Sequence, residues 1–116
     1  MQATARAKNL GMSARKMRLV IDQIRGRDVN EAYAILQFSK KKAARSIGKL
    51  LRSAVANAVY RADEGGETLD VDELYVREAY VDEGRTLRRW RARAYGRATP
   101  RLKRSSHVTV VVDTRD

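Results

Sequence analysis

Nine cationic side chains and no carboxylate lie between Gly84 and Val112. The nine are Arg85, Arg88, Arg89, Arg91, Arg93, Arg97, Arg101, Lys103 and Arg104. Because this segment has no acidic residue of its own, it needs a partner that is dense in negative charge. Guanidinium groups bind phosphates through paired hydrogen bonds and stack on exposed bases. The chemistry that these residues offer is therefore nucleic-acid binding, and RNA is the expected partner.

The charges outside this segment are also unevenly distributed. Residues 1–27 hold seven cations and one acid, and Lys40 to Arg61 hold seven cations and no acid. Nine of the 14 acids lie between Asp63 and Glu83, which we call the acidic flank. We expect the flank to face solvent or basic neighbours, and the positive faces to bind RNA. The RNA-binding candidates outside the arginine-rich segment are Arg6, Lys8, Arg15, Lys16, Arg18, Arg25, Lys40, Lys41 and Lys42.

Length and composition limit the class of protein. We expect residues 1–116 to form one domain, whose core the 43% of hydrophobic residues can fill. The absence of cysteine excludes disulfides and thiolate metal sites. The residues from Met1 to Lys8 include no apolar stretch, so we expect no secretory signal. No apolar run approaches the length of a membrane span. We therefore expect a cytoplasmic protein with no membrane partner, no cofactor and no homo-oligomer.

Hydrophobic periodicity predicts one short strand and three helices in the first part of the chain. Ala3, Ala5 and Ala7 alternate with polar residues, which is typical of a strand with one buried face. A first helix is expected after Ser13 and before Gly26. Asn30 and Ser39 are the predicted N-caps of the second and third helices. The third helix should run to Gly65 and Gly66, with its core positions at Ala44, Ile47, Leu51, Ala54 or Val55, and Ala58.

Two β-like stretches flank the arginine-rich segment. They run from Val71 to Val81 and from His107 to Val112, and if they pair, the segment between them is a long hairpin. We expect a compact body (1–81 and 105–116), and an extended hairpin (82–104) with its tip near Arg91 to Gly96. The predicted fold class is α+β, with three helices packed on a small antiparallel sheet and a long protruding β-hairpin.

Two features of the sequence leave alternatives open. Trp90 and Tyr95 either stack on unpaired bases, which is worth about 1–3 kcal/mol per base, or pack on the opposite strand of the hairpin. Arginine outnumbers lysine 18 to 7. This excess suits binding to folded RNA, but a genome rich in G and C would produce it as well.

Six segments, in this order along the chain, closely resemble the bacterial form of the large-subunit ribosomal protein twenty-two family. They are Ser13–Val20, Ile24–Gly26, Ser53–Ala58, Val81–Gly84, Arg93–Ala98 and Lys103–Val112. Together they extend over nearly the whole chain. In many members a proline stands where this chain has Ala92, and a smaller hydrophobic residue stands where it has Trp90.

The resemblance implies a structural constituent of the large ribosomal subunit that is not an enzyme. It implies binding to several domains of the large-subunit rRNA, contacts with neighbouring ribosomal proteins, and a role in early subunit assembly. The body of such a protein lies beside the exit of the nascent-peptide tunnel, and its hairpin lines the tunnel, where it meets the nascent polypeptide. The resemblance places Arg88, Arg89, Trp90, Arg91, Ala92 and Arg93 at the tunnel-lining tip.

Three other classes of function agree less well with the sequence. A free helix-turn-helix DNA-binding protein is the main alternative, but its recognition helix would be Glu31 to Phe38, which has no Lys or Arg. An enzyme is disfavoured because Asp82 and Glu83 are adjacent and would face opposite sides of a strand. His107 is the only histidine, and no second metal ligand is spaced near it, so we expect no metal site. A basic amphipathic membrane binder would need its aromatic residues on one helix.

Overall fold

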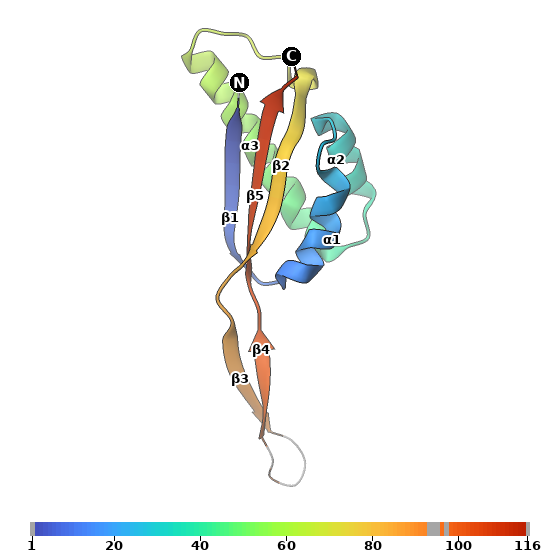
Figure 1. Ribbon diagram of the computed structural model, residues 1–116, viewed down its shortest axis with the longest axis vertical. Helices are drawn as coiled ribbons and strands as arrows, with labels where there is room; N and C mark the ends of the chain where they lie inside the picture. Colours follow the sequence, from blue (N-terminus) through green and yellow to red (C-terminus); the bar gives the residue numbers. More distant parts are fainter. Residues whose placement is uncertain (1, 93–95, 97, 116) are drawn as a thin grey trace.

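The computed structural model describes residues 2–92, 96 and 98–115. In chain order the elements are β1 (Ala3–Leu10), α1 (Ala14–Ile24), α2 (Val29–Phe38), α3 (Lys42–Glu64), a 3-10 turn (Val71–Glu73), β2 (Leu74–Glu83), β3 (Leu87–Ala92), β4 (Ala98–Lys103) and β5 (Ser106–Thr114). The strands β1, β5 and β2 form an antiparallel sheet in that order, and β3 pairs with β4 in a second ladder (Figure 1). The predicted α+β fold class is confirmed.

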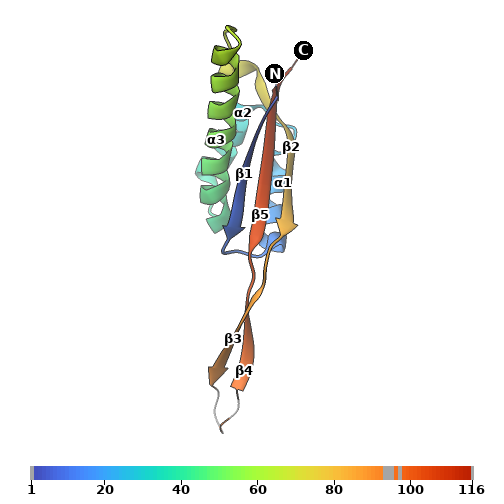
Figure 2. The same ribbon diagram turned by 90° about the vertical axis from the view of Figure 1, so that its left-hand side faces the viewer.

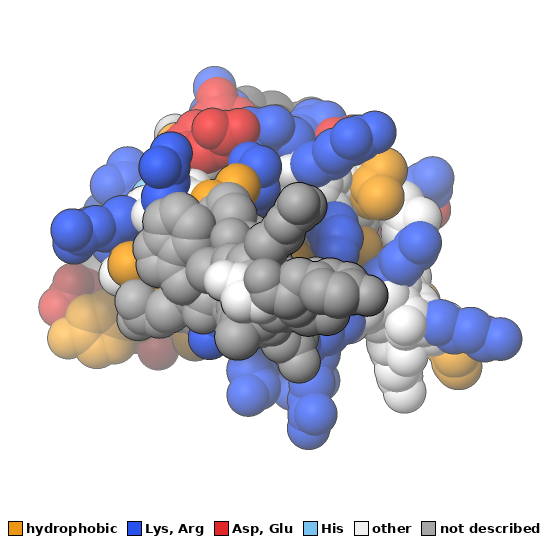
Figure 3. All heavy atoms as spheres, turned by 90° about the horizontal axis from the view of Figure 1, so that it is seen from below, with side chains coloured by type: hydrophobic (Ala, Val, Ile, Leu, Met, Phe, Trp, Pro, Cys, Tyr) orange, Lys and Arg blue, Asp and Glu red, His pale blue; other side chains and the backbone are white. Residues whose placement is uncertain are grey.

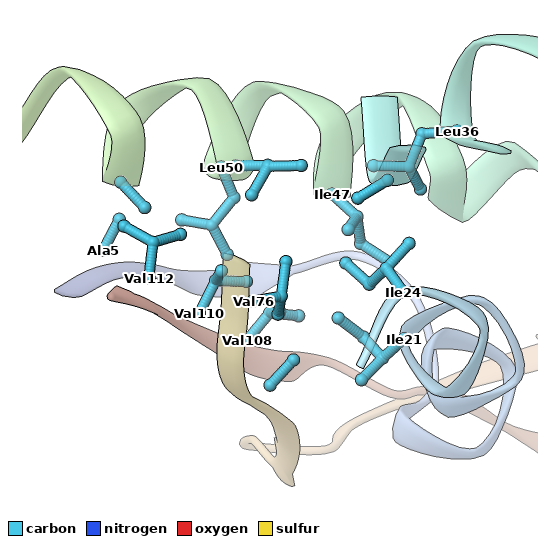
Figure 4. Close-up of a cluster of buried hydrophobic side chains, with 14 of the residues drawn as sticks. Ala5, Ile21, Ile24, Leu36, Ile47, Leu50, Val76, Val108, Val110 and Val112 are labelled. Atoms are coloured by element: carbon cyan, nitrogen blue, oxygen red, sulfur yellow. The ribbon is translucent and has the colours of Figure 1, made fainter. Parts of the chain in front are cut away.

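All three helices lie on the same face of the three-stranded sheet, and its other face is uncovered (Figure 2). α3 packs on β1 and β5, while α1 packs on β2. The core lies between these two layers. Figure 4 shows Val108, Val110 and Val112 of β5 pointing toward the helices, where they meet side chains such as Ile24 and Ile47. All five are fully buried, and each such side chain contributes about 1.5–3 kcal/mol to folding.

Sequence periodicity located the long helix and its buried face. Every predicted core position of α3 is buried, including both Ala54 and Val55. Ala54 and Ala58 are small, as are Ala3 and Ala5 on β1, and all four are buried. Small side chains on both elements let α3 lie close to the strand.

Two of the three predicted helix starts are wrong. Asn30 lies inside α2, whose N-cap is Asp28, and Ser39 follows α2, while the N-cap of α3 is Lys41. The Asn30 amide instead donates a hydrogen bond of 2.6 Å to Asp72, and the Ser39 hydroxyl accepts one of 3.2 Å from the Lys41 N–H. Because each side chain has another partner, neither caps the predicted helix. Ser13 is the N-cap of α1, as predicted.

Residues of α3 and of the turn after α1 cover the two open edges of the three-stranded sheet. On β1, the carbonyls of Gln2 and Thr4 accept hydrogen bonds from Arg61 and Asn57 of α3. On β2, Val76 pairs through its backbone with the turn after α1, accepting from Gly26 N–H, whose φ is +80°. Unpaired edge strands attract other chains, so these contacts protect the sheet from edge-to-edge association.

The first of the two predicted β-like stretches, Val71 to Val81, begins and ends later than predicted: it is the strand β2, Leu74–Glu83. Residues Val71–Glu73 form the 3-10 turn, because the Asp70 carboxylate accepts the Asp72 N–H and caps it. The sheet then continues to the pair Glu83–Ser106, two residues beyond the expected boundary at residue 81. We call residues 84–105 the arm. It extends the molecule to 67 Å against 27 and 16 Å in the other directions, and both termini lie at the opposite end (Figure 1).

The neck of the arm is where Gly84 and Ser105 lie side by side. The Gly84 N–H donates to the Ser105 carbonyl (2.9 Å), and the Ser105 hydroxyl donates to the Arg85 carbonyl (2.6 Å). A Cβ on Gly84 would lie 2.6 Å from the Ser105 Oγ and 3.1 Å from the His107 Cε1. Glycine is therefore required here for close approach of the two strands.

We predict that Gly84→Ala lowers the free energy of unfolding by about 1–2 kcal/mol, because the methyl group must displace Ser105 and break its hydrogen bond. Urea unfolding followed by circular dichroism measures this change. Gly11→Ala is the control, since a Cβ at Gly11 meets nothing within 4 Å. Equal stability of the two variants would contradict the proposed packing at the neck.

Candidate nucleic-acid interface

A hollow of about 920 Å³ lies at the neck, between the body and the base of the arm. We call it the neck hollow. Five predicted RNA-binding residues from three separate parts of the chain line it: Arg15, Lys16, Lys42, Lys103 and Arg104. Among the described residues that line it, one is acidic, Glu83. The fold therefore concentrates positive charge that is dispersed along the sequence.

The N-terminal ends of α1 and α3 add positive potential to the neck hollow. The N-caps Ser13 and Lys41 make no side-chain cap hydrogen bond, and the first turn of each helix has no acidic residue. The first N–H groups of a helix have no partner within the helix and carry a partial positive charge. Both helix ends therefore favour an anion such as a phosphate at the neck.

The arm presents cations on both of its faces. Leu87 pairs with Lys103 and Arg88 pairs with Leu102 in the β3–β4 ladder. Directly opposite residues share a face, and successive residues alternate, so Lys103 and Arg88 point to opposite sides. Both are exposed, as are Arg85 and Arg104. Figure 3 looks along the arm and shows Lys and Arg side chains around that end of the molecule.

Some predicted contacts lie outside what the structure describes. Arg93, Tyr95 and Arg97 are not among the described residues. For β3 and β4 the structure gives the backbone and pairing of the strands, but not the side chains of Arg89, Trp90, Arg91, Ala92 and Arg101. Their roles remain predictions.

The uncovered face of the sheet carries a second group of predicted contacts. Arg6 and Lys8 are exposed on β1, as their alternation with alanines predicted. Arg6 pairs with Thr109 of β5, and Thr109 pairs with Tyr80 of β2. This row places a guanidinium and a half-exposed aromatic ring on the uncovered face of the sheet, where a base or a phosphate could bind.

Two predicted RNA-binding residues make hydrogen bonds within the fold. The Arg18 guanidinium donates to the Val81 carbonyl at 2.9 Å, and the Arg25 guanidinium donates to the Ala79 carbonyl at 2.8 Å. Arg25 also forms an ion pair with Asp22 at 2.8 Å. Both arginines cover the outer edge of β2. We therefore assign them a structural role, unlike the cations that line the neck hollow.

The lysine triplet divides between two places. Lys42 lines the neck hollow, whereas Lys41 lines a different groove between α2 and α3. Lys40 is exposed in the loop before α3. Sequence reasoning named this triplet but missed Arg45, Lys49 and Arg52, which line the same groove as Lys41. Their spacing of three and four residues within a predicted helix was the available signal.

The described residues do not gather into other kinds of site. Among them, no group of three or more His, Cys, Asp and Glu side chains could hold a metal ion. No helix in the described part of the chain is long and apolar enough to cross a membrane. The His107 Nδ1 accepts a hydrogen bond of 3.0 Å from the Asn9 N–H, and so holds the end of β1 in place.

Comparison with known proteins decides the family. Residues 5–113 match the family described as ribosomal protein L22p/L17e. The chain belongs to this family. It is therefore a structural constituent of the large ribosomal subunit, and its predicted location there, in the cytoplasm, is confirmed. The expectation that it is not an enzyme is also confirmed, since its relatives are structural ribosomal proteins.

Curated relatives support the same conclusion over nearly the full length of the chain. The large ribosomal subunit protein uL22 of Lacticaseibacillus casei is 54% identical over 114 residues, which are 98% of this chain and 93% of that protein. The protein of the same name from Clostridium novyi is 50% identical over 115 residues, 99% of both chains. That of Bifidobacterium longum is 47% identical over 116 residues, 100% of this chain and 98% of the relative.

We predict that arginines on the β2 edge and cations at the neck have separable effects. Arg18→Gln with Arg25→Gln should lower the free energy of unfolding by about 1–2 kcal/mol, because strand carbonyls lose charged donors. Arg15→Gln with Lys16→Gln should leave stability within about 0.5 kcal/mol of the parent chain, because both side chains are exposed and form no salt bridge with another described residue.

Paired measurements of urea unfolding and of affinity for an RNA transcript test this division. The neck pair should weaken RNA binding, and the β2-edge pair should reduce stability. A stability loss from the neck pair as large as that from the edge pair would contradict it.

Proposed function

We propose that this member of the L22 family binds large-subunit ribosomal RNA through the neck hollow and the arm. The observation that carries the proposal is the convergence at the neck of five cations and the N-terminal ends of two helices. Backbone N–H groups at the helix ends and the flexible Lys and Arg side chains are the usual ligands of phosphate oxygens. The neck would hold the RNA backbone and fix the direction of the arm.

The arm would be surrounded by RNA rather than lie on its surface. Arg88 and Lys103 project from opposite faces of the β3–β4 ladder, so a partner on one face would leave the other cation unneutralised. A two-stranded ladder is also marginally stable by itself in water. Contacts with more than one segment of RNA would neutralise the cations on both faces of the ladder. This agrees with the expected binding to several rRNA domains.

The elongated shape supports the finer details implied by the family resemblance. We propose that residues 1–116 act as one domain, with the body at the subunit surface beside neighbouring ribosomal proteins. The tip, formed by Arg88, Arg89, Trp90, Arg91, Ala92 and Arg93, would line the nascent-peptide exit tunnel and meet the nascent polypeptide. Binding of separate rRNA domains would also give the chain its role in early assembly. The helix-turn-helix alternative has no support, because α2 carries no Lys or Arg and the turn before it pairs with β2.

We predict that RNA affinity depends steeply on salt. If the chain neutralises about 6–10 phosphates, its affinity should fall about a thousand-fold or more when the salt concentration rises from 50 to 200 mM. Filter binding to a large-subunit rRNA transcript over this range measures the slope. In a cell lysate, the chain should sediment with large subunits in a sucrose gradient and remain there after a high-salt wash. An affinity that is flat in salt, or a chain that stays at the top of the gradient, would contradict the proposal.

We predict that the acidic flank does not bind RNA. Glu64 and Glu67 are exposed, and charge reversal by Glu64→Lys with Glu67→Lys should leave the affinity for an rRNA transcript unchanged or slightly higher. Filter binding measures this, with the neck pair Arg15→Gln and Lys16→Gln as the comparison that weakens it. A large loss of affinity on charge reversal would show that the flank makes contacts with RNA.

A further inference from the structure

A second positive groove, of about 460 Å³, lies between α2 and α3 and shares no lining residue with the neck hollow. Lys41, Arg45, Lys49 and Arg52 line it, all four are exposed, and none of its described lining residues is acidic. No salt bridge among the described residues involves them. Four like charges in one groove repel one another unless a partner neutralises them. We therefore expect the groove to bind an anionic partner.

Two aromatic side chains belong to α2, the helix on one side of the groove: Tyr33 lines the groove, and Phe38 ends the helix. Tyr33 lines the groove beside Arg52: burial raises the pKa of its phenol, and the charge of Arg52 acts in the opposite direction. Phe38 lies between two lining residues, Gln37 and Ser39, and is 81% exposed. A phenylalanine this exposed contributes little to the core. An exposed ring of this kind is suited to stacking on an unpaired base.

Gly48 is one of the residues that line the groove, and it lies in the interior of α3. Glycine is a poor helix former, so its presence there needs a reason. Packing within the chain does not explain the glycine, because a Cβ at Gly48 would meet nothing within 4 Å. Its missing side chain leaves the helix backbone open to close approach by a ligand.

We propose that this groove is a second RNA-binding site, which holds a single-stranded segment by its phosphates and one unpaired base. The proposal rests on the RNA-binding function proposed above. Arg45 and Lys49 are about 6 Å apart along the helix axis, a separation comparable to that of neighbouring phosphates in a strand. These two residues and Arg52 hold the backbone over Gly48, and Phe38 stacks on the base. An acidic peptide would neutralise the same cations but would not use the exposed ring for stacking.

Titration of the ¹⁵N-labelled full chain with a twelve-nucleotide oligoadenylate, followed by NMR, tests the site. Amide shifts are expected at Tyr33 and Gly48, and separately at Lys16 in the neck hollow. Arg45→Gln with Arg52→Gln should abolish the groove shifts, keep the Lys16 shift and lower the salt slope by about 2. Shifts at Lys16 without groove shifts overturn this inference alone, whereas an absence of shifts at both places overturns the proposed function as well. Equal groove shifts with a glutamate decamer overturn the assignment to RNA.

Two matched pairs of variants separate the site from general effects. Phe38→Ala should weaken the affinity read from the Tyr33 amide about tenfold. Its control is Tyr60→Ala, which removes an aromatic ring that is 65% exposed elsewhere on α3. Gly48→Leu should narrow the groove and weaken binding by a similar factor, while Ser53→Leu, at an exposed position of α3 that does not line the groove, should not. Circular dichroism confirms that each variant is folded. Equal losses within either pair would overturn the proposal.

Discussion

The antiparallel pairing of β2 with β5 is the interaction on which the rest of the structure depends. β5 is the middle strand, and its valines at 108, 110 and 112 fill the space beneath the helices. The same two strands leave the body side by side and lead into β3 and β4. A slip of one residue would turn those valines away from the core, and it would also exchange the faces to which the arm cations point. The hydrophobic core therefore fixes the orientation of the arm, although the two are at different ends of the molecule.

The cations of this chain perform two tasks that the sequence does not distinguish. Arg18, Arg25 and Arg61 donate to carbonyls on the outer edges of β2 and β1. A long guanidinium can reach such carbonyls from a helix and still leave its charge partly in water. These three arginines thus help to cover the sheet edges and add positive charge to the surface there. Arg15 and Lys16 are three and two residues before Arg18 on the same helix, yet they line the neck hollow.

The sequence predicted the fold class, the long helix, the strand alternation and the position of the arm, because each depends on hydrophobic periodicity or on turn residues. It failed at the starts of α2 and α3, where Asn30 and Ser39 have partners that only the folded chain brings near. Local cap preference cannot anticipate a tertiary hydrogen bond between Asn30 and Asp72. The candidate site was predicted as a list of cations. Their separation into the neck hollow, the β2 edge and the α2–α3 groove could not be predicted, because it depends on how the helices pack on the sheet.

The charges at the two ends of α3 oppose the helix dipole. Its first turn has no acidic residue and follows Lys41, while Asp63 and Glu64 lie in its last turn beside a single base, Arg61. Each such charge costs an exposed helix about 0.3–1 kcal/mol, so the arrangement weakens α3 in the free protein. Natural sequences break a local rule of this kind chiefly where function requires it. Here the same arrangement places positive charge and positive dipole together at the neck, and negative charge at the end where the termini lie (Figure 1). A phosphate bound at the N-terminal end would remove part of that cost, so RNA binding should stabilise the helix on which the body of the protein is built.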